Sequence, residues 1–301
     1  MPPSVVRVHG ALIAVSLLFG ANYVVTKHLL AVLPAPVWVL FRMTGATLLL
    51  VPLAGLWARG STWPARARWP GLALAALLGV AANQALFTEG LARTTAEHSA
   101  VVNACIPTWT LLVAALVGQE RLTWRRIAAV VSAFAGVSWL LGVDRLLAGL
   151  DVAGSSLAGD LLTIGNGIVF ACHLVWLRRI GRDLHPAATT AMLFLLGTPM
   201  IAAWSGPQLT AAHVGTVLSP PYCWLAAYAI VFATVLTYGL NTWALRHAQS
   251  SQVALYINLQ PIVAAAGNAA LGAPLPGHRF FVALGLVTFG LWLQAKRPPD
   301  G

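Results

Sequence analysis

The chain has 301 residues, of which 58% are hydrophobic and only 9% are charged. A soluble domain carries about 25% charged residues, so this composition excludes a soluble protein and predicts one that spans the membrane many times. Its formal charge of +10 comes from short basic clusters between apolar runs, a pattern typical of loops that face anionic lipids rather than nucleic acid.

Ten apolar runs are long enough to cross a bilayer, which takes about 20 residues per helix. The first run lacks a basic leader and a clean cleavage site, so we expect it to be retained as a span. No connecting segment is long enough for a separate soluble domain. The predicted spans are residues 9–29, 36–56, 69–91, 97–117, 124–143, 157–177, 186–204, 222–245, 250–271 and 278–295.

Lysine and arginine are distributed unequally between the two sides of these spans. Thirteen lie at the two termini or in the loops that follow even-numbered spans, four lie in the opposite loops, and Arg42 lies within a span. Basic residues accumulate on the cytoplasmic side of membrane proteins. The pattern therefore predicts a multi-pass protein of the plasma (inner) membrane with both termini in the cytoplasm.

The first span contains "FGANYVVTK" (19–27), which places an amide and a lysine in an apolar run. Asn22 lies within the span and is a candidate for a solute site near the midplane. Lys27 ends the span, about 7 Å of helical rise beyond Asn22. It is either an anchor at the lipid interface or a charge of an outer gate.

Two ionisable residues follow in the second and third spans. Arg42 could bind a carboxylate or phosphate of a solute, or form a structural ion pair with Glu89. Glu89 is taken to be the only carboxylate within a span, and it could also carry a proton.

The second half of the chain repeats the first. "SAVVNACIPTWTLLVAALVG" (99–118) aligns without gaps with "VALYINLQPIVAAAGNAALG" (253–272) at an offset of 154, and an offset of 151 aligns Asn22 with His173. Five spans precede the second copy, so the copies have opposite orientations. We therefore expect an all-α membrane protein of ten helices in two inverted five-helix repeats, residues 1–150 and 151–301, an architecture typical of transporters.

Several short motifs follow one another along nearly the whole chain, and their order is informative. They are Phe19–Tyr23 with Lys27, Phe41-Arg42, "SAVVNACIPTW", Glu120-Arg121-Leu122, "LTYGLNTWAL" (236–245) and "LQPIVAA" (259–265). This order resembles the drug/metabolite transporter superfamily, specifically its EamA-type exporters. The chain departs from the family pattern at Phe19, where a Trp is usual, at Gln260, where a Glu is usual, and at Ala273-Pro274, where an acidic residue is common.

Polar and aromatic side chains inside the spans predict a cavity between the two halves. Nine amides lie within spans, more than helix packing requires, although each amide could instead form a hydrogen bond between helices worth about 1 kcal/mol. His173 is either a packing residue or a proton site, since histidine titrates near neutral pH. The predicted cavity residues are Asn22, Asn83, Asn103, His173, Tyr238, Asn241, Tyr256 and Gln260.

These features favour a secondary transporter that exports small metabolites, amino acids or drugs by alternating access. The alternatives are a channel or receptor and a membrane-embedded enzyme. The sequence contains no nucleotide-binding loop and none of the common hydrolase motifs. Its three cysteines have no metal-ligand spacing, so no metal or cofactor is expected. The expected partners are a small-molecule solute and membrane lipids, not nucleic acid, and the oligomeric state stays open. Proton coupling through His173 or Glu89 is a further hypothesis.

Overall fold

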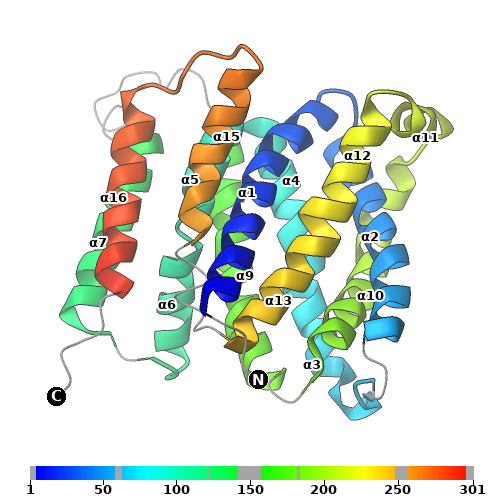
Figure 1. Cartoon of the computed structure of the whole chain (residues 1–301), viewed down its shortest axis with the longest axis horizontal. Coiled ribbons are helices and arrows are strands. Elements are labelled where there is room, and N and C mark those ends of the chain that lie inside the picture. The colour runs from blue at the N-terminus through cyan, green and yellow to red at the C-terminus, as the bar shows by residue number, and fades with distance from the viewer. Residues whose placement is uncertain are drawn as a thin grey trace.

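The computed structural model describes residues 5–57, 63–120, 122–141, 157–181, 184–247 and 256–295, and the regular secondary structure in these residues is helical. Helices suit these apolar segments because each satisfies its own backbone hydrogen bonds, which lipid cannot do. The helices pack side by side in one bundle (Figure 1). In chain order, with η marking short 3₁₀ or π segments, the elements are α1 (Val5–Leu29), α2 (Ala35–Trp57), η1 (Arg66–Arg68), α3 (Trp69–Ala76), η2 (Leu77–Ala82), α4 (Asn83–Arg93), α5 (Ala96–Asn103), α6 (Ile106–Leu116), α7 (Trp124–Leu141), α9 (Leu157–Ile180), α10 (Pro186–Ser205), η3 (Gly206–Gln208), α11 (Ala211–Leu218), α12 (Tyr222–Ile230), η4 (Val231–Leu236), α13 (Thr237–His247), η5 (Tyr256–Asn258), α15 (Leu259–Ala270) and α16 (His278–Ala295).

Eight helical stretches in the described residues are long and apolar enough to cross a membrane. They correspond to the first eight predicted spans, with ends that agree within about four residues. The ninth predicted span, 250–271, contains η5 and α15 and extends into residues outside the described part, and the tenth corresponds to α16. The prediction of an all-helical membrane protein is confirmed, and ten is an approximate count. The loop helix α11 was not predicted.

The beginning of α1 and the end of α16 lie at the same end of the bundle, the lower end in Figure 1. We call this the terminal end, and we call the opposite end, where α1 ends and α16 begins, the far end. The shared end agrees with an even number of crossings. That the terminal end faces the cytoplasm stays a prediction from the basic residues.

Helices α7 and α16 contact each other through glycines that leave room for the opposing backbone. A Cβ atom on Gly136 would lie 2.9 Å from the carbonyl oxygen of Ala283, and one on Gly290 would lie 2.6 Å from that of Ala129. Such small residues permit close helix packing in membranes. Ala129 and Gly136 precede Ala283 and Gly290 by 154 residues, the offset of the sequence repeat. The contact is therefore reciprocal and antiparallel, as inverted copies require.

Helices α2 and α10 form a second reciprocal pair. The Oγ1 atoms of Thr47 and Thr198 lie 2.7 Å apart, within hydrogen-bond distance. A Cβ atom on Gly45 of α2 would lie 2.8 Å from Ile230 of α12, and one on Gly197 of α10 would lie 2.8 Å from Val80 of η2. One helix of each half thus packs against the interrupted span of the other half.

Departures from regular α-helix also recur at the repeat offset. The π-helical segments η2 and η4 are 154 residues apart, and π segments inside helices frequently lie at functional sites. Gly118 and Gly272 both adopt positive φ, 73° and 86°, which residues with side chains rarely adopt. These recurrences support two repeats. The predicted boundary between residues 150 and 151 lies outside the described residues and stays a prediction.

Candidate functional site

Arg42, the eighth residue of α2, lies between the two halves of the chain and is 0% exposed. Its Nε donates to Oγ1 of Thr234 in η4 at 2.8 Å, and its Nη2 donates to the carbonyl oxygen of Ala233 at 3.4 Å. Its Nη1 donates to Oε1 of Gln84 in α4 at 3.3 Å. The ring of Phe19 in α1 lies 6.0 Å from its Cζ atom. The guanidinium is thus surrounded by neutral groups.

No carboxylate in the described part of the chain contacts Arg42. The expected ion pair with Glu89 is wrong, because Glu89 pairs with Arg93 one turn further along α4. The reason is geometric: α4 presents Gln84 to Arg42, and Glu89 is five residues or about 140° away around the helix. The other described carboxylates also have partners elsewhere, Glu97 with Asn268, Glu120 with Arg126 and Asp160 with Thr94.

A chain of hydrogen bonds surrounds this guanidinium with polar groups from both halves. The Nε2 atom of Gln84 donates to the hydroxyl of Tyr238 at 3.2 Å and to Oδ1 of Asn83 at 3.3 Å. Nδ2 of Asn166 in α9 donates to the backbone carbonyl of Asn83 at 2.8 Å. Of these residues, Asn83 and Tyr238 were predicted as cavity residues. We define the central cluster as Arg42, Asn83, Gln84, Asn166, Thr234 and Tyr238.

His173 lies beside this cluster, and its position is fixed by packing. Its Nδ1 atom lies 2.8 Å from the carbonyl oxygen of Ala75, and its ring stacks on Phe170 at 5.6 Å between centroids. A Cβ atom on Gly79 of η2 would lie 2.2 Å from that Nδ1. The carbonyl of Gly79 also accepts a hydrogen bond from Tyr238 at 3.4 Å, so η2 connects His173 with the central cluster.

An aromatic wall lies on the α1 side of Arg42. The ring centroids of Phe19 and Tyr23 are 6.3 Å apart, and those of Tyr23 and Phe87 are 5.3 Å apart. The hydroxyl of Tyr23 accepts a hydrogen bond from Nδ2 of Asn103 at 3.0 Å. Asn103, a predicted cavity residue, therefore contacts this wall rather than Arg42 itself.

Asn22 is 0% exposed and one turn beyond Phe19 on α1. Its Oδ1 accepts a hydrogen bond from Thr26 at 3.2 Å, whereas its Nδ2 has no hydrogen-bond partner among the described residues. Oδ1 of Asn103 is likewise buried and without a partner in that part of the chain. Leaving a buried polar atom unsatisfied costs about 1–3 kcal/mol, so each of these atoms could gain a hydrogen bond from a bound solute.

The other three predicted cavity residues make no contact with the central cluster among the described contacts. The hydroxyl of Tyr256 bonds to His9 near the start of α1, and its carbonyl accepts from Ser16 at 2.6 Å, which places Tyr256 toward the terminal end. Gln260 is buried in α15 next to Gly20, and Asn241 in α13 is partly exposed.

Lys27 holds the end of a neighbouring helix. Its Nζ donates to the carbonyl oxygens of Leu91 at 2.8 Å, Ala92 at 3.1 Å and Thr94 at 2.6 Å. The last carbonyls of a helix have no partner within it, so Lys27 caps the C-terminus of α4. This contact indicates a structural role, and neither the anchor nor the gate hypothesis is tested by it.

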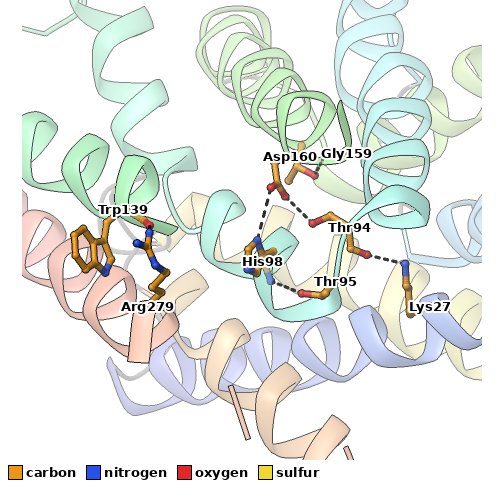
Figure 2. A network of polar contacts seen from close by, with 9 residues as sticks. Lys27, Thr94, Thr95, His98, Trp139, Gly159, Asp160 and Arg279 are labelled. Atoms are coloured by element: carbon orange, nitrogen blue, oxygen red, sulfur yellow. Dashed lines mark hydrogen bonds and ion pairs between the residues drawn. The ribbon is translucent and has the colours of Figure 1, made fainter. Parts of the chain in front are cut away.

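A second buried charge, at the far end, was missed from the sequence. Asp160 in the first turn of α9 is 1% exposed and accepts a hydrogen bond from Oγ1 of Thr94 at 2.6 Å, and its Oδ2 lies 3.7 Å from Nδ1 of His98 (Figure 2). Thr95 caps α5 by accepting from the backbone N–H of His98 at 3.2 Å. We call Thr94, Thr95, His98 and Asp160 the far-end cluster. Asp160 falls inside the predicted span 157–177, so the statement that Glu89 was the only carboxylate within a span is wrong.

The sequence profile described as "EamA-like transporter family" matches residues 8–142 and 157–295. The chain is 26% identical over 294 residues to the uncharacterized inner membrane transporter YedA of Escherichia coli, covering 94% of this chain and 89% of that protein. It is 25% identical over 214 residues to the uncharacterized transporter YyaM of Bacillus subtilis, covering 70% of this chain and 67% of YyaM.

A solved crystal structure shares the fold. It superposes with a TM-score of 0.64 at 16% sequence identity, covering 95% of this chain and 96% of that one. At this identity the likeness shows the arrangement of helices alone.

Proposed function

The chain belongs to the EamA-like transporter family, and from this premise we propose that it is a secondary transporter that carries a small solute across the inner membrane by alternating access. The central cluster supports this most directly. Arg42 and Gln84 from the first half meet Thr234 and Tyr238 from the second half. Between oppositely oriented repeats, such a site opens to one side at a time when the repeats tilt against each other.

The packing of the bundle is consistent with this mechanism. The central cluster is buried, and the far end is fastened by Asp160 of α9, which holds Thr94 between α4 and α5. Opening toward the far end would separate α9 from that connection.

We propose export as the direction, with small metabolites, amino acids or drugs as the class of cargo. Resemblance to EamA-type exporters supports efflux, and the name of YedA as an inner membrane transporter supports the location. The driving force would be the gradient of the solute itself or of a coupled ion.

The test combines a metabolite screen with reconstitution. Extracellular metabolites are compared between cells that overexpress the protein and cells that lack it, and each solute that accumulates outside is then loaded into proteoliposomes. We expect substrate-dependent counterflow, in which unlabelled solute inside accelerates uptake of labelled solute. Empty liposomes are the control.

The other functional classes give different results in the same assay. A channel conducts the solute without acceleration by counterflow, and an enzyme yields a chemically altered product. No movement of any solute above that in empty liposomes would contradict transport altogether.

A further inference from the structure

We propose that the central cluster binds the carboxylate of a small organic monoanion, and that the guanidinium of Arg42 is the group that binds it. This inference rests on the proposed transport function and adds the charge class of the substrate. It depends on three observations: the missing counter-charge of Arg42, the lengths of its hydrogen bonds, and the apolar wall beside it.

The charge of Arg42 has no acidic partner among the described residues. The chain has eight carboxylates, and the four that the structure describes contact other residues. The remaining four are outside the described residues and outside the predicted spans, at Asp144, Asp151, Asp183 and Asp300. A buried ion is costly unless an opposite charge compensates it, and unpaired charges within membrane spans mark solute pathways.

The hydrogen bonds of Arg42 leave one edge of the guanidinium available. A guanidinium has five N–H donors. Three donors of Arg42, one each on Nε, Nη1 and Nη2, form hydrogen bonds with described residues. The bond from Nε to Thr234 is short, 2.8 Å, and fixes the group. The bonds from Nη1 and Nη2, at 3.3 and 3.4 Å, are longer than the usual range of about 2.7–3.2 Å. A carboxylate would accept from these two nitrogens at about 2.7–2.9 Å.

Two of the three neutral partners of Arg42 also have other hydrogen bonds. The hydroxyl of Thr234 also donates to the carbonyl of Ala229 at 2.8 Å, and the carbonyl of Ala233 also accepts from Thr237 at 2.9 Å. A solute could therefore replace the contact from Nη2 without leaving the carbonyl of Ala233 unsatisfied. Oε1 of Gln84, whose described hydrogen bond comes from Arg42, would then accept a hydrogen bond from the solute.

The surroundings favour a carboxylate with an apolar body over a phosphate. The described contacts of the cluster contain a single cation, which matches one negative charge rather than two. Next to it, Phe19, Tyr23 and Phe87 form the aromatic wall, which can bury apolar atoms of the solute. The unpartnered Nδ2 of Asn22, one turn from Phe19, adds a hydrogen-bond donor.

The experiment uses proteoliposomes loaded with a uniformly ¹³C-labelled small-molecule extract of bacterial cells, and it identifies released solutes by mass spectrometry. The variants are Arg42→Gln, which removes the charge, and Arg42→Lys, which keeps the charge but loses the forked geometry. Arg66→Gln, at an exposed arginine of η1, is the matched control. Thermal unfolding of each purified protein checks that it is folded.

We expect wild type and Arg66→Gln to release solutes that carry a carboxylate. Arg42→Gln should release them at least tenfold more slowly, and Arg42→Lys should show an intermediate rate. If Arg42→Gln does not fold, an unchanged rate in Arg42→Lys overturns the proposal and a slower rate supports it.

Two other outcomes contradict the proposal and are distinguishable. Release of solutes without an acidic group, or equal release by folded Arg42→Gln, leaves transport intact and overturns the carboxylate site. Release no faster than from empty liposomes contradicts the proposed function itself.

Discussion

The central cluster and the far-end cluster each bury one ionisable side chain, but the groups that surround these two side chains differ. Arg42 is surrounded by neutral groups and has no acidic partner in the described part of the chain. Asp160 accepts a short hydrogen bond from Thr94 and has His98 beside it. The short hydrogen bond of Asp160 holds α9 against the connection between α4 and α5. Arg42 has no counter-ion among the described residues, so its guanidinium can still bind an anion. The comparison predicts that removing the first charge impairs transport and that removing the second impairs stability.

The largest effect is expected for Arg42→Met, the strongest test of this comparison. Transport of an anionic solute should fall by tenfold to a hundredfold, because the binding group is gone. Thermal stability should be unchanged or higher, since replacing an uncompensated buried charge by an apolar side chain is often neutral or stabilising. Transport assays and thermal unfolding on the same preparation measure both. A large drop in melting temperature with normal transport would reverse the roles of the two clusters.

For Asp160→Ala we expect a loss of stability of about 2–3 kcal/mol, because the buried hydroxyl of Thr94 loses a charged acceptor. In large domains each kcal/mol lowers the melting temperature by about 2–4 °C. The matched control is Glu120→Gln, whose carboxylate pairs with Arg126 while 29% exposed, so its effect should be below about 1 kcal/mol. Equal melting temperatures for the two variants would show that Asp160 does not fasten the far end.

Gly79→Ala tests how tightly His173 is held beside the central cluster. The added Cβ atom would overlap the ring of His173, and such overpacking costs about 1–3 kcal/mol. Gly239→Ala, in α13 of the second half, is the control, because a Cβ atom there would have no neighbour within 4 Å. Both are measured by thermal unfolding. Similar stability in the two variants would mean that His173 moves freely and is not held by η2.

The smallest effect concerns the pair of His98 and Asp160. Nδ1 of His98 and Oδ2 of Asp160 are 3.7 Å apart and the His98 side chain is 25% exposed, so we expect a coupling free energy below about 1 kcal/mol. A double-mutant cycle with His98→Gln and Asp160→Asn measures it. A larger coupling would mean that the histidine, and not only Thr94, fastens α9 at the far end.

The membrane spans were predictable because they depend on the length and composition of apolar runs, whereas the two repeats stay a prediction. Apolar runs located eight membrane helices within a few residues, and the offset of 154 recurs in the positions of η2 and η4. The contacts between helices were not predictable in the same way. They depend on how each helix is rotated and how far it slides along its neighbour.

Arg42 and Tyr256 illustrate this limit. The sequence suggested Glu89 as a partner for Arg42, but α4 presents Gln84 to it, and Glu89 lies five residues further along that helix. Tyr256 aligns with the cavity region along the chain, yet its hydroxyl reaches His9 near the terminal end. Asp160 is a different case, because its position inside a predicted span was a visible signal that sequence reasoning overlooked.

The reciprocal contact between α7 and α16 resembles the isologous interface of a two-fold dimer, built here within one polypeptide. In a true dimer every substitution appears twice, once in each subunit. In a fused chain the halves can diverge while the shared contact, with Gly136 and Gly290, keeps its symmetry. At the 151-residue offset that relates Thr47 to Thr198, the counterpart of Arg42 is Leu193. The site proposed at Arg42 therefore has one guanidinium rather than two, and the proposal predicts one anionic solute per chain.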